Sequence, residues 1–253
     1  MLSPLYFYRA TPKDKRKKDS LISRFLFRPI SYLFASFFSF LHISANKVSV
    51  LSIFVAIASG ILFLFDNQIC RIVGASLVIF WCVLDCTDGD LARAYGPKAN
   101  GELYDGVAGY VLIAWLYPCV GVSLFFTGGL FFQANFPWSI LLGAGASVFD
   151  LSFRLIFKKY GELSYDLKTS KKTSKEMEKE WTTKATFLGR TLHLIRRLNL
   201  FFGIDGLLSI WLLISTIFSW VDLFIIPYFC INAILWVGTI TFCLYSSRKI
   251  HLE

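Results

Sequence analysis

The sequence predicts an all-α integral membrane protein with six transmembrane helices preceded by an interfacial amphipathic helix. Hydrophobic residues make up 55% of the 253 positions and charged residues only 17%, against about a quarter in an average soluble domain. Even so, 26 Lys and Arg against 17 Asp and Glu give a net charge of +9. A chain that is both apolar and basic keeps these properties apart when its helices face lipid and its basic residues gather in loops on one side.

Long apolar runs recur along the chain and define the expected spans. The first, 48–65, has no charged residue over the roughly 18 residues needed to cross about 30 Å of hydrocarbon. The second, 72–84, is too short alone, but it continues without Pro into an acidic segment, so we expect this helix to extend beyond the lipid. The remaining spans are expected at 107–126, 137–157, 200–220 and 223–245.

The segment 20–43, before the first span, is apolar but contains Arg24, Arg28 and Pro29. A spanning helix would not tolerate these residues, so we interpret the segment as a helix in the cytoplasmic interface with its arginines near lipid phosphates. The alternative, a seventh span, would move the N-terminus to the other side and break the charge pattern.

The distribution of Lys and Arg predicts the sidedness. Nine precede residue 48 and eleven lie between 158 and 197, whereas the loops expected on the opposite side carry only Arg71. Both termini are therefore expected in the cytoplasm, in a multi-pass arrangement with membrane lipids as neighbours. The expected organisation is a cytoplasmic N-terminus with its interfacial helix (1–47), a transmembrane domain (48–245) with a charged cytoplasmic loop (158–197), and a cytoplasmic tail (246–253). The net charge follows from this sidedness, and we expect no nucleic acid partner.

Acidic residues cluster where two expected spans reach the cytoplasm. Five of the 17 fall within the 21 residues from Asp85 to Asp105, and carboxylates at membrane depth are costly unless paired or metal-bound. Asp85 and Asp88 are i, i+3 neighbours, and Gly101 and Asp105 stand at i, i+4 on the next helix. A short turn between antiparallel helices would bring three carboxylates together, which suits Mg²⁺, Mn²⁺ or Ca²⁺ rather than zinc. The alternative, solvated acids in a turn, stays open at this point.

Small residues flank the carboxylates in the same pattern. Gly89, Ala92 and Gly101 would leave room for a bulky or phosphorylated ligand against the helix backbones. Arg93 lies next to that surface and is a candidate phosphate partner.

The full string, Asp85-x-x-Asp88-Gly89-x-x-Ala92-Arg93 followed by Gly101-x-x-x-Asp105, resembles the signature of the CDP-alcohol phosphotransferases (CDP-alcohol phosphatidyltransferases). Asn46-Lys-Val-Ser49 is similar to the family's Asn-x-x-Thr sequence. The resemblance implies a homodimeric six-helix enzyme of phospholipid or related phosphodiester biosynthesis. Such an enzyme moves a substituted phosphate from a CDP-linked donor, either CDP-diacylglycerol or a CDP-amino alcohol, to a hydroxyl acceptor and releases CMP.

The resemblance also implies roles for the motif residues. Asp85, Asp88 and Asp105 would be catalytic and would hold a divalent metal, Mg²⁺ or Mn²⁺, at the diphosphate. The residues that would receive the CDP moiety are Gly89, Ala92, Arg93 and Gly101. The active site would lie on the cytoplasmic side.

Two departures from the family pattern matter. Seven residues rather than eight separate the motif Arg from the next Gly, a small change in a surface turn. The family's fourth Asp, regarded as a metal ligand and the base that activates the hydroxyl, is replaced by Gly109. Either Glu102, Asp90 or Asp150 substitutes for it, or transfer proceeds without a dedicated base, or the chain is a catalytically impaired CDP-binding pseudoenzyme or assembly subunit. A transporter is less favoured, because the acids gather at one membrane face.

Two further features leave alternatives open. Asp150 and Arg154 stand at i, i+4 within the fourth expected span. They would either form a structural ion pair or contact the substrate, and both interpretations stay open at this point. The strongly charged stretch 168–184 is interpreted as a solvated cytoplasmic helical hairpin.

Overall fold

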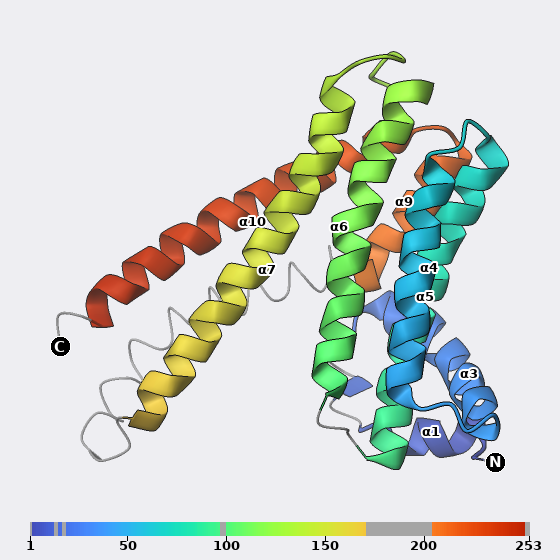
Figure 1. The fold of residues 1–253 in the computed structure, drawn as a ribbon, viewed down its shortest axis with the longest axis vertical. Coiled ribbons are helices and arrows are strands. Elements are labelled where there is room, and N and C mark those ends of the chain that lie inside the picture. The colour runs from blue at the N-terminus through green and yellow to red at the C-terminus, as the bar shows by residue number, and fades with distance from the viewer. Residues whose placement is uncertain (1, 13–14, 17–18, 97–99, 171–203, 251–253) are drawn as a thin grey trace.

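The computed structural model describes residues 2–12, 15–16, 19–96, 100–170 and 204–250, which form helices joined by turns (Figure 1). Within these residues the chain contains no strand. In chain order the elements are α1 (Pro4–Ala10), η1 (Ser23–Phe27), α3 (Arg28–Phe40), α4 (Ala45–Phe63), α5 (Gln68–Tyr95), α6 (Gly101–Thr127), α7 (Trp138–Ser170), η2 (Ile204–Leu208), α9 (Ser209–Ile217) and α10 (Val221–Ile250), of which η1 and η2 are single π-helical turns.

Five of the helices, α4, α5, α6, α7 and α10, are long and apolar enough to cross a membrane. Large apolar side chains such as Phe54, Leu155 and Ile234 remain more than half exposed on them, as expected for surfaces that face lipid. The all-α membrane class is therefore confirmed. The sixth expected span coincides with a shorter apolar helix, Gly206–Ile217, and residues 200–203 lie outside the described part, so the sixth span stays a prediction.

Helices α4, α5 and α6 pack closely through small residues and hydrogen bonds to backbone carbonyls. The Ser59 hydroxyl donates to the carbonyl oxygen of Gly74 at 3.0 Å, joining α4 to α5. The indole N–H of Trp115 on α6 donates to the carbonyl oxygen of Ile57 on α4 at 3.1 Å. Such contacts join helices in lipid, where the hydrophobic effect gives them no reason to associate.

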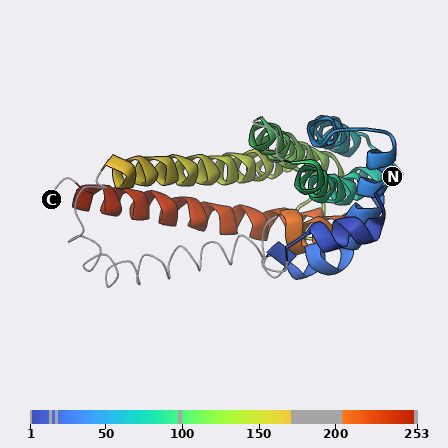
Figure 2. The same ribbon diagram turned by 90° about the horizontal axis from the view of Figure 1, so that it is seen from below.

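Helices α7 and α10 pack along each other, and α7 also packs against α6. Both views show them side by side, leaning away from α4 and α5 (Figures 1 and 2). The carboxylate of Asp150 accepts a hydrogen bond from Arg154 Nε at 2.7 Å and another from the Tyr228 hydroxyl at 2.6 Å. The structure thus shows Asp150 and Arg154 as an ion pair, and Tyr228 ties that pair to α10.

The turn between α6 and α7 is held by a buried carboxylate from α10. Asp222 accepts hydrogen bonds from the backbone N–H groups of Leu130, Phe131 and Phe132, and its side chain is fully buried. This contact fixes the ends of α6, α7 and α10 relative to one another at the end of the bundle remote from α1.

The N-terminal helices α1 and α3 lie across the other end of the bundle (Figure 1). Phe7, Tyr32 and Phe38 pack there against Val48 and Leu84 in a second apolar cluster, apart from the main core. The expected charged hairpin, 168–184, lies mostly in 171–203, outside the described residues.

We predict that Gly143→Ala destabilises the fold by about 1–3 kcal/mol, the usual cost of overpacking. Helices α6 and α7 touch at Gly121 and Gly143, so a Cβ at Gly143 would collide with the Tyr117 carbonyl oxygen and lie 2.8 Å from Gly121 Cα. Thermal unfolding in lipid nanodiscs measures the effect. Gly238→Ala on α10 is the matched control, because its Cβ would meet nothing within 4 Å and Ala favours helix by up to about 1 kcal/mol. Equal stability of the two variants would contradict the close approach.

Candidate functional site

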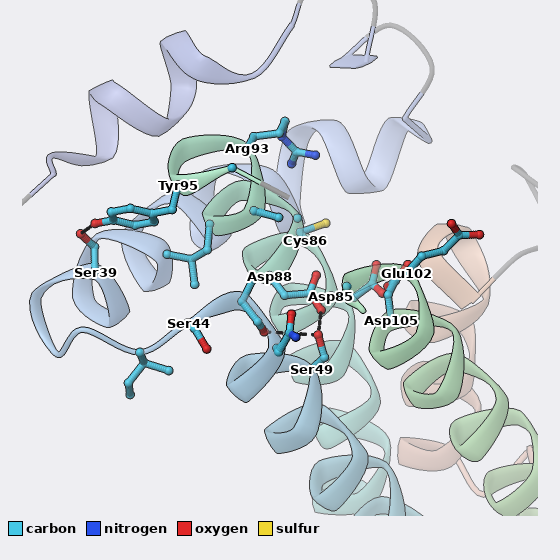
Figure 3. A pocket seen from close by; sticks show the side chains of 18 of the residues that line it. Ser39, Ser44, Ser49, Asp85, Cys86, Asp88, Arg93, Tyr95, Glu102 and Asp105 are labelled. Atoms are coloured by element: carbon cyan, nitrogen blue, oxygen red, sulfur yellow. Dashed lines mark hydrogen bonds between the residues drawn. The ribbon is translucent and has the colours of Figure 1, made fainter. Parts of the chain in front are cut away.

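A pocket of about 850 Å³ opens at the end of the bundle that α1 and α3 cross. Its walls come from the start of α4, the last turns of α5, the first turns of α6, and the N-terminal segment (Figure 3). All seven site residues expected from the sequence line it: Asp85, Asp88, Gly89, Ala92, Arg93, Gly101 and Asp105.

The backbone explains why two helices present these residues together. Helix α5 runs unbroken to Tyr95 and ends at Gly96, whose φ of +91° suits glycine better than any residue with a side chain. The chain then turns back, and α6 begins at Gly101 after Asn100. The end of α5 and the start of α6 both pack against α4 and both line the pocket.

The three motif carboxylates face the pocket from these two helices (Figure 3). Asp88 is buried, with 6% of its surface exposed, and accepts a hydrogen bond from the Ser49 hydroxyl at 2.5 Å. Asp105 is exposed, and its charge repels that of Asp88. This repulsion favours a cation in the pocket.

Carboxylate oxygens are the ligands that Mg²⁺ and Mn²⁺ prefer, so the donor set fits a hard divalent ion. Within the described residues, no group of three or more His, Cys, Asp or Glu side chains is arranged to hold a metal as it stands. Binding of one ion by Asp85, Asp88 and Asp105 would therefore require their carboxylates to move closer together.

Arg93 takes part in an ion pair as well as lining the pocket. Its Nη2 donates to Asp90 Oδ1 at 2.6 Å, and its guanidinium lies over Gly89, where a Cβ would be 3.3 Å from both terminal nitrogens. Gly89 thus leaves room for the guanidinium to lie close to α5.

The expectation that Arg28 faces lipid phosphates is wrong. Its side chain is only 7% exposed and donates to Asp19 Oδ2 at 2.9 Å and to Asp90 Oδ1 at 3.0 Å. Burial acts to lower the pKa of Arg28, but Cys86, Asp19 and Asp90 together raise it above its usual value. Arg28 therefore remains charged and faces the end of α5 instead of the lipid.

The comparison with protein families agrees with this geometry. The model of the CDP-alcohol phosphatidyltransferase family matches residues 42–242, a range that includes the first turn of α4, the α5–α6 hairpin and all seven motif residues. The chain belongs to the CDP-alcohol phosphatidyltransferase family. No curated protein and no solved structure matches it.

Membership in this family supports a role in phosphatidyl transfer in phospholipid synthesis. The family is generally dependent on a divalent metal, in keeping with the carboxylates of the pocket.

Gly109, which stands where the fourth motif Asp is expected, has open space around it in this member of the family. A Cβ at Gly109 would meet nothing within 4 Å, so packing does not require glycine there. Of the three acids considered as substitutes, Glu102 lines the pocket, whereas Asp90 and Asp150 do not. Those two are instead buried in ion pairs with arginines.

Sequence reasoning did not assign the pocket residues that precede α5. Lys15, Arg28, Ser39 and His42 line the pocket, yet no local spacing connects them to the motif. Ser49 was singled out only for its place in the Asn-x-x-Ser string, and its hydrogen bond to Asp88 gives that string a physical reason.

We predict that Gly101→Ala leaves the fold intact but weakens binding of a cytidine nucleotide about tenfold. The added methyl would have only ordinary contact with Asn46 Oδ1, at 3.9 Å, while it would occupy pocket space, and crowding of this kind costs about 1–3 kcal/mol. Calorimetric titration with CDP and Mg²⁺, alongside thermal unfolding, measures both effects. Gly106→Ala, on the same helix but not in the pocket, is the control and should bind normally. If both variants bind like the unsubstituted protein, Gly101 does not receive the nucleotide.

Proposed function

We propose that this chain transfers a substituted phosphate from a CDP-linked donor to the hydroxyl of an alcohol acceptor and releases CMP. The observation that supports this most is the gathering of all seven motif residues around one pocket. CDP-diacylglycerol and CDP-amino alcohols are the donors considered. A screen of CMP release over pairs of these donors with hydroxyl acceptors identifies the substrates.

The small residues of the pocket suit the nucleotide. Gly89, Ala92 and Gly101 offer little side chain, so the CDP moiety can lie close to the backbones of α5 and α6. The Arg93 guanidinium borders the same wall, where it can pair with a phosphate oxygen.

In the reaction the acceptor oxygen attacks the phosphorus of the substituted phosphate. A new P–O bond forms as the bond to the CMP oxygen breaks, the electron pair leaves with CMP, and the hydroxyl proton passes to a carboxylate. Asp85, Asp88 and Asp105 would hold a divalent metal, which neutralises charge on the diphosphate and stabilises the leaving CMP.

The proton acceptor we assign is Glu102. It lines the pocket and lies one turn before Asp105 on α6. Asp90 is unsuitable because both of its carboxylate oxygens already accept hydrogen bonds from the chain's own donors.

Gly109 supports a second candidate, a pseudoenzyme that binds CDP without turning it over. Such a chain would keep the nucleotide pocket and lack the carboxylate that completes the reaction. Binding of CDP without CMP release from any donor would favour this candidate over the transferase.

We further propose that both termini and the pocket face the cytoplasm, with 1–47, 48–245 and 246–253 as N-terminal region, membrane domain and tail. The Lys and Arg distribution supports this orientation, and the pocket lies at the end of the bundle where the N-terminus is found (Figure 1). Protease protection of tagged termini in sealed vesicles tests it. The homodimer implied by the family resemblance stays a prediction, to be measured by light scattering.

We predict that Asp105→Asn lowers CMP release about 10²-fold, the usual effect of removing one group that stabilises transition-state charge. The amide keeps the size of the carboxylate and removes its charge. The control is Asp66→Asn, because the Asp66 side chain is 92% exposed and remote from the pocket. Unchanged turnover of Asp105→Asn with an identified substrate pair would contradict the role given to Asp105.

We predict that Glu102→Gln slows CMP release by about 10²-fold or more and that adding Gly109→Asp restores most of it, since general base help is worth about 10²–10⁴-fold. A Cβ at Gly109, one turn after Asp105 on α6, would meet nothing within 4 Å, so packing does not oppose the substitution. Initial rates of all four combinations of the two substitutions measure the rescue. If Glu102→Gln alone has no effect, Glu102 is not the proton acceptor. If the unsubstituted chain is inactive and Gly109→Asp activates it, the pseudoenzyme candidate holds.

A further inference from the structure

Asp90 is a buried carboxylate close to the pocket that accepts hydrogen bonds from several side chains, although no motif role falls on it. Its side chain has no exposed surface. Oδ1 accepts from Arg28 Nη1 at 3.0 Å and from Arg93 Nη2 at 2.6 Å, while Oδ2 accepts from the Ser31 hydroxyl at 2.7 Å. The hydroxyl of Thr11 adds a longer contact of 3.4 Å. A buried carboxylate with this many donors is held in one orientation.

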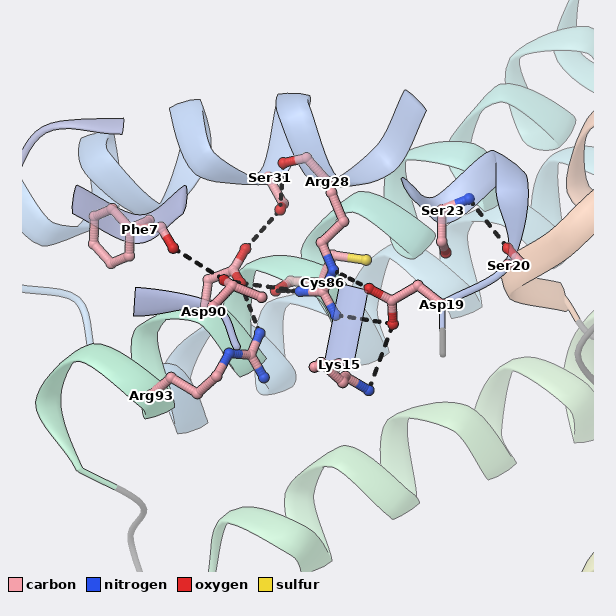
Figure 4. Close-up of polar contacts among 11 residues, drawn as sticks. Phe7, Lys15, Asp19, Ser20, Ser23, Arg28, Ser31, Cys86, Asp90 and Arg93 are labelled. Atoms are coloured by element: carbon pink, nitrogen blue, oxygen red, sulfur yellow. Dashed lines mark hydrogen bonds and ion pairs between the residues drawn. The ribbon is translucent and has the colours of Figure 1, made fainter. Parts of the chain in front are cut away.

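Three of these four partners come from the N-terminal segment, residues 2–40, which precedes the family match at 42 (Figure 4). Arg28 also donates to the Cys86 carbonyl oxygen at 3.4 Å and pairs with Asp19. The segment is therefore attached through Asp90 to the last turns of α5, the helix that presents the motif.

Arg93, the fourth partner, connects this cluster to the pocket. One of its terminal nitrogens is taken by Asp90, whereas its buried Nε has no hydrogen-bond partner. The guanidinium lies over Gly89 and lines the pocket. Donors left over on a guanidinium fixed in this way suit the oxygens of a phosphate.

The charges of this cluster also favour a phosphate ligand beside Arg93. Arg28, Arg93 and Lys15 face the carboxylates of Asp90 and Asp19, which leaves one positive charge in excess within this cluster. Lys15 itself lines the pocket. The acids Asp85, Asp88, Glu102 and Asp105 also line the pocket, so an anionic ligand would be bound on the side of Arg93 and Lys15.

We propose that Asp90 is a positioning residue for donor binding: together with Arg28 and Ser31 of the N-terminal segment, it fixes the Arg93 guanidinium over Gly89 to receive the diphosphate of a CDP-linked donor. This inference rests on the proposed function. On this inference the N-terminal segment, which lies outside the motif, also takes part in substrate binding.

The test compares CDP affinity with stability in the full-length protein in nanodiscs. Asp90→Asn keeps the shape and removes the charge that orients Arg93, so the Kd for CDP with Mg²⁺, and the KM for any active donor, should rise about tenfold or more, with kcat changed less. Asp150→Asn is the control: it removes a buried Asp–Arg pair of similar length, 2.7 Å, away from the pocket, so it should lower the unfolding temperature and leave Kd unchanged.

A milder pair of variants covers the case in which Asp90→Asn does not fold. Ser31→Ala removes one hydrogen bond to Asp90, and we expect CDP binding to weaken about threefold. Ser36→Ala on the same helix removes a hydrogen bond to the Leu2 carbonyl oxygen and should leave binding unchanged. If the Ser31 and Asp90 variants lose stability but keep normal Kd, Asp90 has a structural role only and the inference is overturned. If the unsubstituted protein does not bind CDP, the proposed function fails first and this inference fails with it.

Discussion

The site depends on one constraint: α5 has to be long enough both to cross the apolar layer and to place carboxylates beyond it. Its 28 residues span about 42 Å at 1.5 Å per residue, while the hydrocarbon layer is about 30 Å thick. The helix is therefore long enough for its last turns, from Asp85 to Arg93, to reach the polar region beyond that layer. The chain then returns as α6, whose first turns line the same pocket as these last turns of α5, so a site built here would lie near the membrane surface.

The sequence predicted what depends on local spacing. The i, i+3 and i, i+4 relations along two helices and a short turn were enough to place seven residues around one pocket. Arg28 and Asp90 stand 62 residues apart, and no helical periodicity relates two such positions. The sequence favours a lipid contact for Arg28, because an arginine in an apolar segment usually lies near lipid phosphates. Its buried acidic partners become visible only when the tertiary structure folds the N-terminal segment onto α5.

The helices divide into a part that builds the site and a part that does not touch it. Within the described residues, the pocket takes side chains from α3, α4, α5 and α6 and from the N-terminal segment, and none from α7 or α10. The latter pair is held by its own buried network of Asp150, Arg154 and Tyr228 and is attached to α6 where Gly121 meets Gly143. Buried charged side chains therefore serve two purposes in this chain: one group holds the pocket and the other holds α7 to α10. Their position within apolar helices does not by itself distinguish the two groups.

The N-terminal segment and the motif helix behave as one unit for an electrostatic reason. Asp90 lies on α5 between Asp88 and Arg93, and its burial is tolerable only while Arg28 and Ser31 stay in place. Removing one partner of a buried ion pair costs about 3–5 kcal/mol, because the other charge is left uncompensated. Displacing the segment would expose the Asp90 carboxylate to solvent or leave it buried without these partners. Arg93 would then no longer be held in one orientation. The pocket residues that precede the family match are thus coupled to the motif residues within the match, because both groups hold the single buried carboxylate of Asp90.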